Sequence, residues 1–134
     1  MILDKNLLDS LLEQAAASPR LRQNFDLRTS VADTSQRMLN ALQPDTQVPI
    51  HQHLETTETV VCLCGRLEEI YYEPVEAADG AGQPTFKEIG RELLCPAEGL
   101  YGLQIPVGVW HTIRVLEPSV IFEAKDGAYQ PRPA

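Results

Sequence analysis

Only three histidines occur in the chain, and their positions constrain its fold and chemistry more than any other feature. His51 and His53 are separated by one residue, and Glu58 follows shortly after them. Side chains at positions i and i+2 of a β-strand project to the same face, so both imidazoles can point to one place. Glu58 begins the next expected strand and can return across the hairpin. The spacing therefore predicts a β-hairpin that presents two imidazoles and one carboxylate together.

The third histidine follows a proline-glycine turn much later in the chain. Pro106 and Gly108 form this turn, which starts another expected strand with His111 at its head. Three imidazoles and one carboxylate suit Fe(II), Mn(II), Ni(II), Cu(II) or Zn(II). We therefore expect one divalent metal ion, with His51, His53, Glu58 and His111 as its ligands. Zinc is the expected adventitious occupant, and iron, manganese and nickel are the alternatives in the cell.

The remaining pattern indicates one helix followed by many short strands. Leucines at i, i+4 spacing over residues 4–17 predict an amphipathic helix with Asp4 as its N-cap, packed on the outside of the fold. Apolar alternation then predicts strands at 21–27, 37–42, 48–53, 59–63, 66–72, 86–89, 102–105, 112–116 and 120–124, with turns at 64–65 and 117–119 and a long surface loop at 73–84. Many strands at this spacing favour a sandwich or barrel.

Composition excludes several classes of function. The net charge of −8 is opposite to the clustered positive charge that nucleic-acid binding requires. No apolar run approaches the roughly 20 residues that cross a bilayer, and the first residues do not resemble a signal peptide. We therefore expect a cytoplasmic protein with no membrane or nucleic-acid partner. The three cysteines are expected to be reduced thiols.

Residues 51–65 and 106–111 resemble the two sequence motifs of the cupin superfamily. The first motif matches from His51 to Gly65, and the centre of the second matches at Pro106, Gly108 and His111. The chain departs from the motifs at positions that are not ligands in the family, namely Asp45, Leu100 and Val115. The resemblance implies a mainly β fold, a double-stranded β-helix (the cupin jelly-roll barrel) with one N-terminal α-helix. It implies a single cupin domain over residues 1–134, with the barrel at about 36–125.

Segments across nearly the whole chain also resemble the WbuC family of cupin-fold metalloproteins. They are residues 18–25, 36–42, 105–112 and 122–129. This resemblance implies a link to bacterial surface-polysaccharide (O-antigen) synthesis. We expect a metal-dependent enzyme acting on a sugar or sugar nucleotide, as an isomerase or epimerase, or as an oxygenase with Fe(II). The alternative is a non-catalytic binding or sensing cupin. An open cavity with convergent polar side chains favours catalysis, whereas a closed apolar pocket favours sensing.

Several further residues are candidates for roles around the metal. Arg20, Arg22 and Asn24 alternate along one strand, and with Arg37 they are candidate substrate-binding residues for an anionic small molecule. The competing interpretation is that these arginines form salt bridges at the edge of a homodimer, the oligomeric state that we expect. Strand parity places Cys62 and Cys64 in the interior, as small apolar residues or alternatively as thiols near the metal, and makes Glu68 and Glu123 candidate acid/base groups at inward positions, although glutamates on a barrel exterior are commoner. Trp110 and Tyr129 are candidates for stacking on a sugar, but Trp110 is expected on the face opposite His111, which favours packing in the core or an interface.

Overall fold

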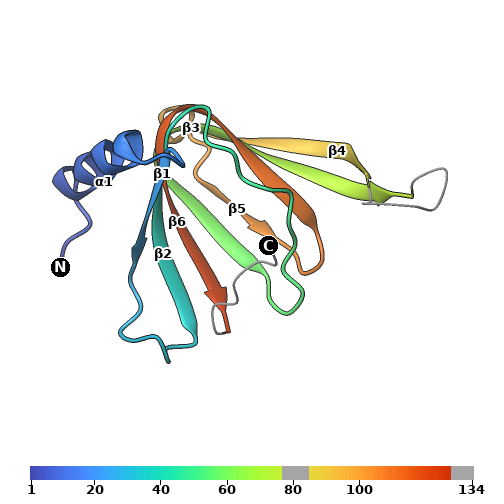
Figure 1. Ribbon diagram of the computed structural model, residues 1–134, viewed down its shortest axis with the longest axis horizontal. Helices are drawn as coiled ribbons and strands as arrows, with labels where there is room; N and C mark the ends of the chain where they lie inside the picture. The colour runs from blue at the N-terminus through green and yellow to red at the C-terminus, as the bar shows by residue number, and fades with distance from the viewer. Residues whose placement is uncertain (77–84, 128–134) are drawn as a thin grey trace.

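The computed structural model describes residues 1–76 and 85–127. It is a mainly β fold in which one helix precedes an antiparallel sheet, as predicted (Figure 1). The elements are α1 (Lys5–Ala17), β1 (Arg22–Asp26), β2 (Ser35–Leu42), β3 (Glu58–Val75), β4 (Thr85–Leu94), the 3₁₀ turn η1 (Pro96–Glu98), β5 (Gly102–Ile105) and β6 (Trp110–Asp126). Most of the loop expected at 73–84 lies outside the described residues, although β3 continues to Val75.

Helix α1 covers the outer face of the sheet, as its apolar spacing predicted. The Asp4 carboxylate accepts a hydrogen bond from the backbone N–H of Leu7 at 3.0 Å, which caps the first turn. Leu11 and Ala15 are buried in an outer cluster with three sheet residues, Leu39, Ala41 and Val120. Packing against the sheet therefore stabilises a helix that is short for independent stability.

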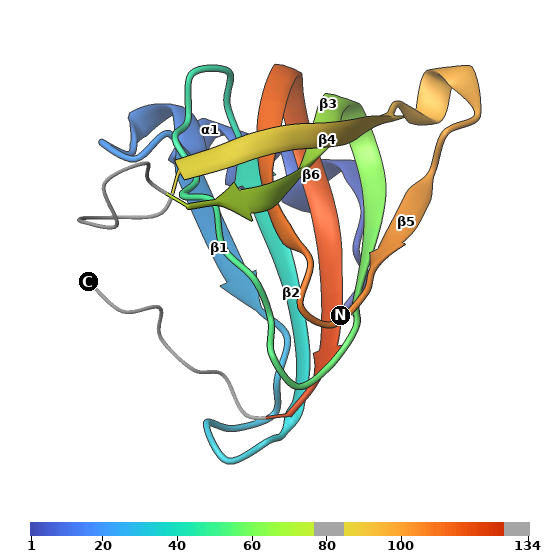
Figure 2. The same ribbon diagram turned by 90° about the vertical axis from the view of Figure 1, so that its right-hand side faces the viewer.

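Strands β3 and β6 are long, bent and paired along most of their length, and each replaces two of the predicted strands. The first half of β3 pairs with the end of β6 (Glu58 with Lys125), and its second half pairs with the start of β6 (Tyr71 with His111). Register shifts lie between Cys62 and Leu67, where the ribbon of two strands bends. The predicted turns at 64–65 and 117–119 are thus irregularities within continuous strands. Figure 2 shows both strands curving through the molecule.

Gly65 lies at this bend and is required there for two reasons. Its φ of +99° is in the region that side chains other than glycine rarely adopt. A Cβ at this position would lie 2.2 Å from the Ser119 hydroxyl oxygen and 2.4 Å from the carbonyl oxygen of Pro118. The same hydroxyl accepts a hydrogen bond from the backbone N–H of Arg66 at 3.0 Å. The close approach of β6 at Gly65 therefore sets where the ribbon bends.

The bend folds the sheet into two facing layers. One layer has the order β1, β2, end of β6, start of β3, β5, and the other contains β4, the rest of β3 and the start of β6. Apolar side chains from both layers form an inner core that includes Leu42, Val60, Leu67, Val115 and Ile121. Among the described residues, no ladder joins β1 to β4 or β5. The predicted jelly-roll barrel is therefore correct in its folded antiparallel sheet and wrong in its closure.

The strand expected at 48–53 is reduced to a single bridge. His51 and His111 exchange backbone hydrogen bonds of 3.0 and 2.8 Å, which extends the second layer by one residue pair. Pro49 has no N–H to donate, so a longer ladder is disfavoured at this edge. The bridge nevertheless joins the two histidine segments, which are distant in the sequence.

Candidate metal centre

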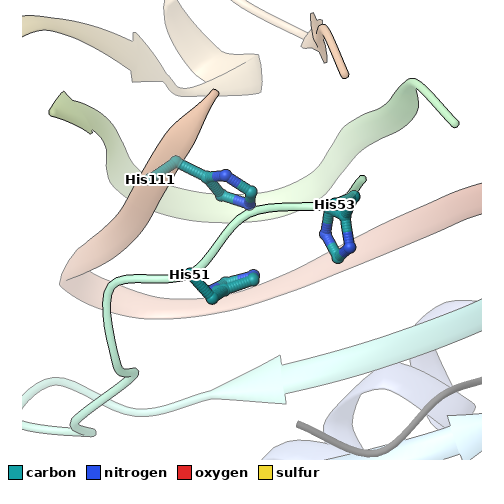
Figure 3. A group of neighbouring side chains, drawn as sticks. All are labelled: His51, His53 and His111. Carbon is teal, nitrogen blue, oxygen red and sulfur yellow. The ribbon is translucent and has the colours of Figure 1, made fainter. Parts of the chain in front are cut away.

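The three histidines meet at one point of the fold, as their spacing predicted. His51 and His53 lie on the segment before β3, and His111 lies near the start of β6 (Figure 3). One ligand nitrogen from each imidazole lies within 4.8 Å of the other two. The ring centroids of His51 and His111 are 4.2 Å apart, and His53 lies 5.2 and 5.3 Å from them. The backbone bridge between His51 and His111 explains this proximity, because it fixes their Cα atoms side by side.

Backbone carbonyls orient two of the three imidazoles. The Nδ1 atom of His51 lies 2.9 Å from the carbonyl oxygen of Pro49, and the Nδ1 atom of His111 lies 2.9 Å from that of Val109. A carbonyl oxygen can only accept, so each Nδ1 carries the proton and donates it. Each Nε2 therefore has a lone pair, which is the form of neutral imidazole that binds metals.

Glu58, the fourth predicted ligand, is the first residue of β3 and lies beside His53. Its Oε2 atom lies 2.8 Å from Nε2 of His53, and the side chain is largely buried. Burial raises the pKa of Glu58, but its hydrogen bond to His53 and its electrostatic interactions with the three histidines outweigh this effect and lower the pKa below its usual value. Glu58 is therefore an ionised carboxylate beside three imidazoles.

The donor set and its spacing are compatible with one metal ion. Three nitrogens and one carboxylate oxygen suit a first-row divalent ion. Two ligands about 2.1 Å from one ion and at right angles are about 3 Å apart, close to the separation of the His53 and Glu58 atoms. The three histidines can therefore hold one metal ion, and Glu58 contacts His53 beside this group without belonging to it.

The histidine cluster lies in the wall of a cavity of about 440 Å³ between the two layers. Polar side chains from several strands line it, including Asn24, Gln36, Asn40, Glu69 and Glu123. This size is within the range of cavities that hold small molecules. The lining mixes polar and apolar side chains and includes exposed residues, so the cavity is unlike a closed apolar pocket.

Glu69 is a buried carboxyl in the cavity lining, and the alternation of the sequence had not identified it as an inward residue. It is only 2% exposed, and its pKa is raised well above the usual value by burial and by the charges of Glu58, Glu123 and Glu92. Burial therefore favours the protonated carboxyl, the form that can donate a hydrogen bond.

The prediction of Glu68 as an inward group was wrong, and its failure has a physical cause. Glu58, Val60 and Cys62 face inward, but the bulges that follow add a residue and reverse the parity. Glu69 then faces the cavity, whereas Glu68 pairs with Arg91 at 3.2 Å. Glu123, the other candidate, does line the cavity.

The arginine candidates fall on two different faces. Arg20, Arg22 and Asn24 all line the cavity, but only Arg22 and Asn24 alternate within β1, because Arg20 lies in the turn before this strand. Arg37 does not line it: its guanidinium lies 3.1 Å from Asp33 and donates to two backbone carbonyls. Backbone hydrogen bonds from Ser35 and Thr29, together with Arg37, lower the pKa of Asp33 to about 2. Arg37 thus stabilises the loop before β2 and is separated from the other three candidates.

The cysteines and aromatic candidates contribute no ligand among the described residues. Cys62 lies in the inner core, and burial raises the pKa of its thiol to about 11. Cys64 packs toward helix α1, so the expectation that it also faces inward was wrong, again because of the bulge. Trp110 lies on the face opposite His111 as expected and stacks on Phe86 at 5.0 Å. Tyr129 lies outside the described residues, and the three cysteines form no disulfide.

Comparison with protein families gives one match over more than half of the chain. Residues 3–79 match the model of a family described as a domain of unknown function (DUF6016). The chain belongs to this family. The matched segment of this DUF6016 protein contains His51, His53 and Glu58, and His111 lies beyond it. No curated protein matches the chain.

Solved structures similar to this DUF6016 protein include cupin-fold proteins. Conserved protein SPY1581 of unknown function from Streptococcus pyogenes matches with a TM-score of 0.61 at 10% identity, over 97% of this chain and 90% of that one. Capsular polysaccharide assembling protein CapF from Staphylococcus aureus matches with a TM-score of 0.56 at 17% identity, over 85% of this chain and 30% of CapF. The Cnp3 cupin domain from Schizosaccharomyces pombe matches with a TM-score of 0.52 at 8% identity, over 79% of this chain and 64% of the Cnp3 chain.

These matches show the fold alone, because all three identities are low. The DUF6016 chain spans less than a third of the length of CapF. In the described part of the chain, no helix has the length and apolar character to cross a membrane.

Proposed function

We propose that this DUF6016 protein is a metal-dependent enzyme that acts on a small polar molecule. The observation that carries the proposal is the convergence of three imidazoles, with the Glu58 carboxylate beside His53, on a cavity of about 440 Å³ lined in part by polar side chains. His51, His53, Glu58 and His111 hold one divalent ion. When bound, such an ion supplies Lewis acidity toward a carbonyl or hydroxyl oxygen.

The residues around the ion perform the rest of the chemistry. Burial of Glu69 favours its protonated form, which can donate a proton or hydrogen bond to a substrate oxygen in the cavity. All three histidines are ligands, which leaves Glu69 and Glu123 as the carboxyls that lie deepest beside the substrate. Asn24 and Asn40 offer amides that can orient hydroxyl groups.

The substrate that we propose is a sugar or sugar nucleotide of bacterial surface-polysaccharide synthesis, in a cytoplasmic homodimer. The resemblance to the WbuC family supports this, as does the fold shared with CapF, which is named as a capsular polysaccharide assembling protein. The polar lining favours catalysis, by isomerisation, epimerisation or oxygenation, over the alternative of a non-catalytic sensor, which would need a closed apolar pocket.

Elemental analysis of purified protein tests the metal centre. We expect close to one divalent ion per chain, and loss of most of it in the variant with His51→Ala and His111→Ala. Glu58→Gln should weaken metal binding by roughly tenfold or more, because a neutral amide replaces a charged ligand. Glu68→Gln is the matched control, since Glu68 pairs with Arg91 away from the cavity, and it should retain the metal. Unchanged metal content in the double histidine variant would refute the proposal.

A further inference from the structure

The end of the cavity formed by β1 differs in charge from the end formed by the metal centre. Acidic side chains gather near the histidines, including Glu58, Glu69 and Glu123. An adjoining hollow of about 270 Å³ is lined by Ser18, Arg20, Arg22, Gln23 and Asn24, none of which is acidic. Arg20, Arg22 and Asn24 line both spaces, so the hollow continues the cavity. A basic end of this kind stands out in a chain whose net charge is −8.

The other arginines of this segment are used within the fold. Arg28 pairs with Asp26 at 2.8 Å, and Arg37 pairs with Asp33 at 3.1 Å. Arg20 makes no ion pair in the part of the chain that the structure describes, and its side chain is exposed at the cavity. Arg28 and Arg37 therefore neutralise neighbouring aspartates, whereas Arg20 has no such role within the described fold.

Arg22 is held in place beside Arg20 by a backbone contact. Its Nη1 atom donates a hydrogen bond of 2.9 Å to the carbonyl oxygen of Gln47. This bond restricts the guanidinium, so less rotational freedom is lost when it binds a ligand. The planar fork of a guanidinium matches two oxygens of a phosphate or carboxylate.

The wall between the arginines and the histidines suits a polyhydroxylated carbon skeleton. Asn24, Gln36 and Asn40 offer amide groups on this wall, and Met38 offers an apolar surface. The Nδ2 atom of Asn40 lies 3.5 Å from Glu123 Oε1, which orients the amide. A ligand that touches both ends of the cavity would pass over these four side chains.

We propose that the cavity binds a small polar molecule with a phosphate or carboxylate group, and that Arg20 and Arg22 bind this anionic group while the hydroxyl end of the molecule faces the histidines. This inference rests on the proposed function, because it narrows the substrate class of the same cavity. It gives the two ends separate roles: anion recognition at β1, and chemistry at the metal centre.

Calorimetric titration with three related sugars tests the inference: glucose 1-phosphate, glucuronate and uncharged glucose. Metal-loaded protein should bind one or both anionic sugars at least about tenfold more tightly than glucose. The pattern between the two anionic sugars distinguishes a phosphate from a carboxylate as the recognised group. Equal binding of all three sugars, or binding of none, would overturn the inference.

Charge-matched variants separate the arginine end from the general charge of the protein. Replacing Arg20 and Arg22 with glutamine should weaken binding of the anionic sugar about tenfold or more and leave metal content unchanged. Arg114→Gln, at an exposed position outside the cavity lining, removes the same kind of charge and should change binding less than about twofold. Arg20→Gln alone preserves the bond from Arg22 to Gln47, so it tests the inference if the double variant folds poorly. An equal loss in Arg114→Gln would refute it.

The same titration in the double histidine variant distinguishes the two proposals. Anion binding that persists without metal, and still depends on Arg20, supports the inference even if the metal-dependent function fails. Full metal content combined with binding that is indifferent to Arg20 leaves the proposed function standing and rejects the inference.

Discussion

At the scale of single residues, two backbone carbonyls decide which nitrogen each imidazole offers to the cavity. Pro49 and Val109 each precede a histidine by two positions, and their carbonyl oxygens accept a hydrogen bond from the Nδ1–H of that histidine. The Nε2 lone pairs then point away from the backbone toward the shared space. The pattern is the same on both sides of the His51–His111 bridge, so local backbone geometry orients these two side chains before any ligand arrives.

Gly65 provides the sharpest stability test at this scale. Gly65→Ala places a Cβ against Ser119 and Pro118 at a positive φ, and we expect it to lower the free energy of unfolding by about 2–4 kcal/mol. Gly90→Ala is the control, because a Cβ there has no neighbour within 4 Å, and its effect should stay within about 1 kcal/mol. Urea denaturation of both variants measures the difference. Equal effects would show that the approach of β6 is not the constraint at Gly65.

At the scale of elements, helix α1 is held by packing more than by its cap. Leu11→Ala removes a side chain that is 2% exposed and should cost about 3 kcal/mol of unfolding free energy. Asp4→Ala removes the capping hydrogen bond and should cost about 1 kcal/mol. Leu3→Ala, at a position that is 43% exposed, should have little effect. Thermal and chemical denaturation would rank the three variants, and a larger cost for Asp4→Ala than for Leu11→Ala would contradict this assignment.

Element boundaries also show where prediction from sequence succeeds and where it fails. The helix and the alternating strands were predictable, because apolar periods of 3.6 and 2 follow directly from backbone geometry. The merging of four predicted strands into β3 and β6 could not be predicted. Gly65 and Pro118 are residue types typical of turns, and only the close approach of the two strands at these residues shows that they form a bend. The same bulges moved Cys64 and Glu68 off the inner face. Parity cannot be counted through a bulge that the local pattern does not indicate.

At the scale of the whole molecule, the candidate ligands were predictable and their surroundings were not. The chain has only three histidines, and all of them lie in two short motifs, so the candidate ligands could be identified from the sequence alone. Glu69, Gln36 and Asn40 give no comparable signal: they become neighbours only when β2, β3 and β6 fold into two layers. Arg37 was grouped with Arg20 and Arg22 for its charge, yet β2 turns it to the other face.

The buried carboxyl of Glu69 makes the stability of the whole metal-free protein depend on pH. Its pKa is higher in the folded chain than in the unfolded chain, so the folded chain binds this proton more tightly. The resulting stability is complete below the usual carboxyl pKa of 4.5 and is lost as the pH rises toward the folded value. Glu58 has a lowered pKa, so its contribution to stability is present above the usual value of 4.5 and is lost as the pH falls below it. The effects of Glu58 and Glu69 therefore occupy different pH ranges.

We therefore expect metal-free protein to lose unfolding free energy as the pH rises above the usual carboxyl pKa of 4.5, and Glu69→Gln to flatten this loss and become the more stable form at higher pH. Denaturant titrations across this range measure it, with Glu68→Gln as the control that should follow the wild-type curve. A bound divalent ion favours the ionised form of Glu69, so the difference between Glu69→Gln and wild type should shrink when metal is added. Parallel curves for Glu69→Gln and wild type without metal would mean that Glu69 is ionised at neutral pH, and it could not then act as the proton donor of the cavity.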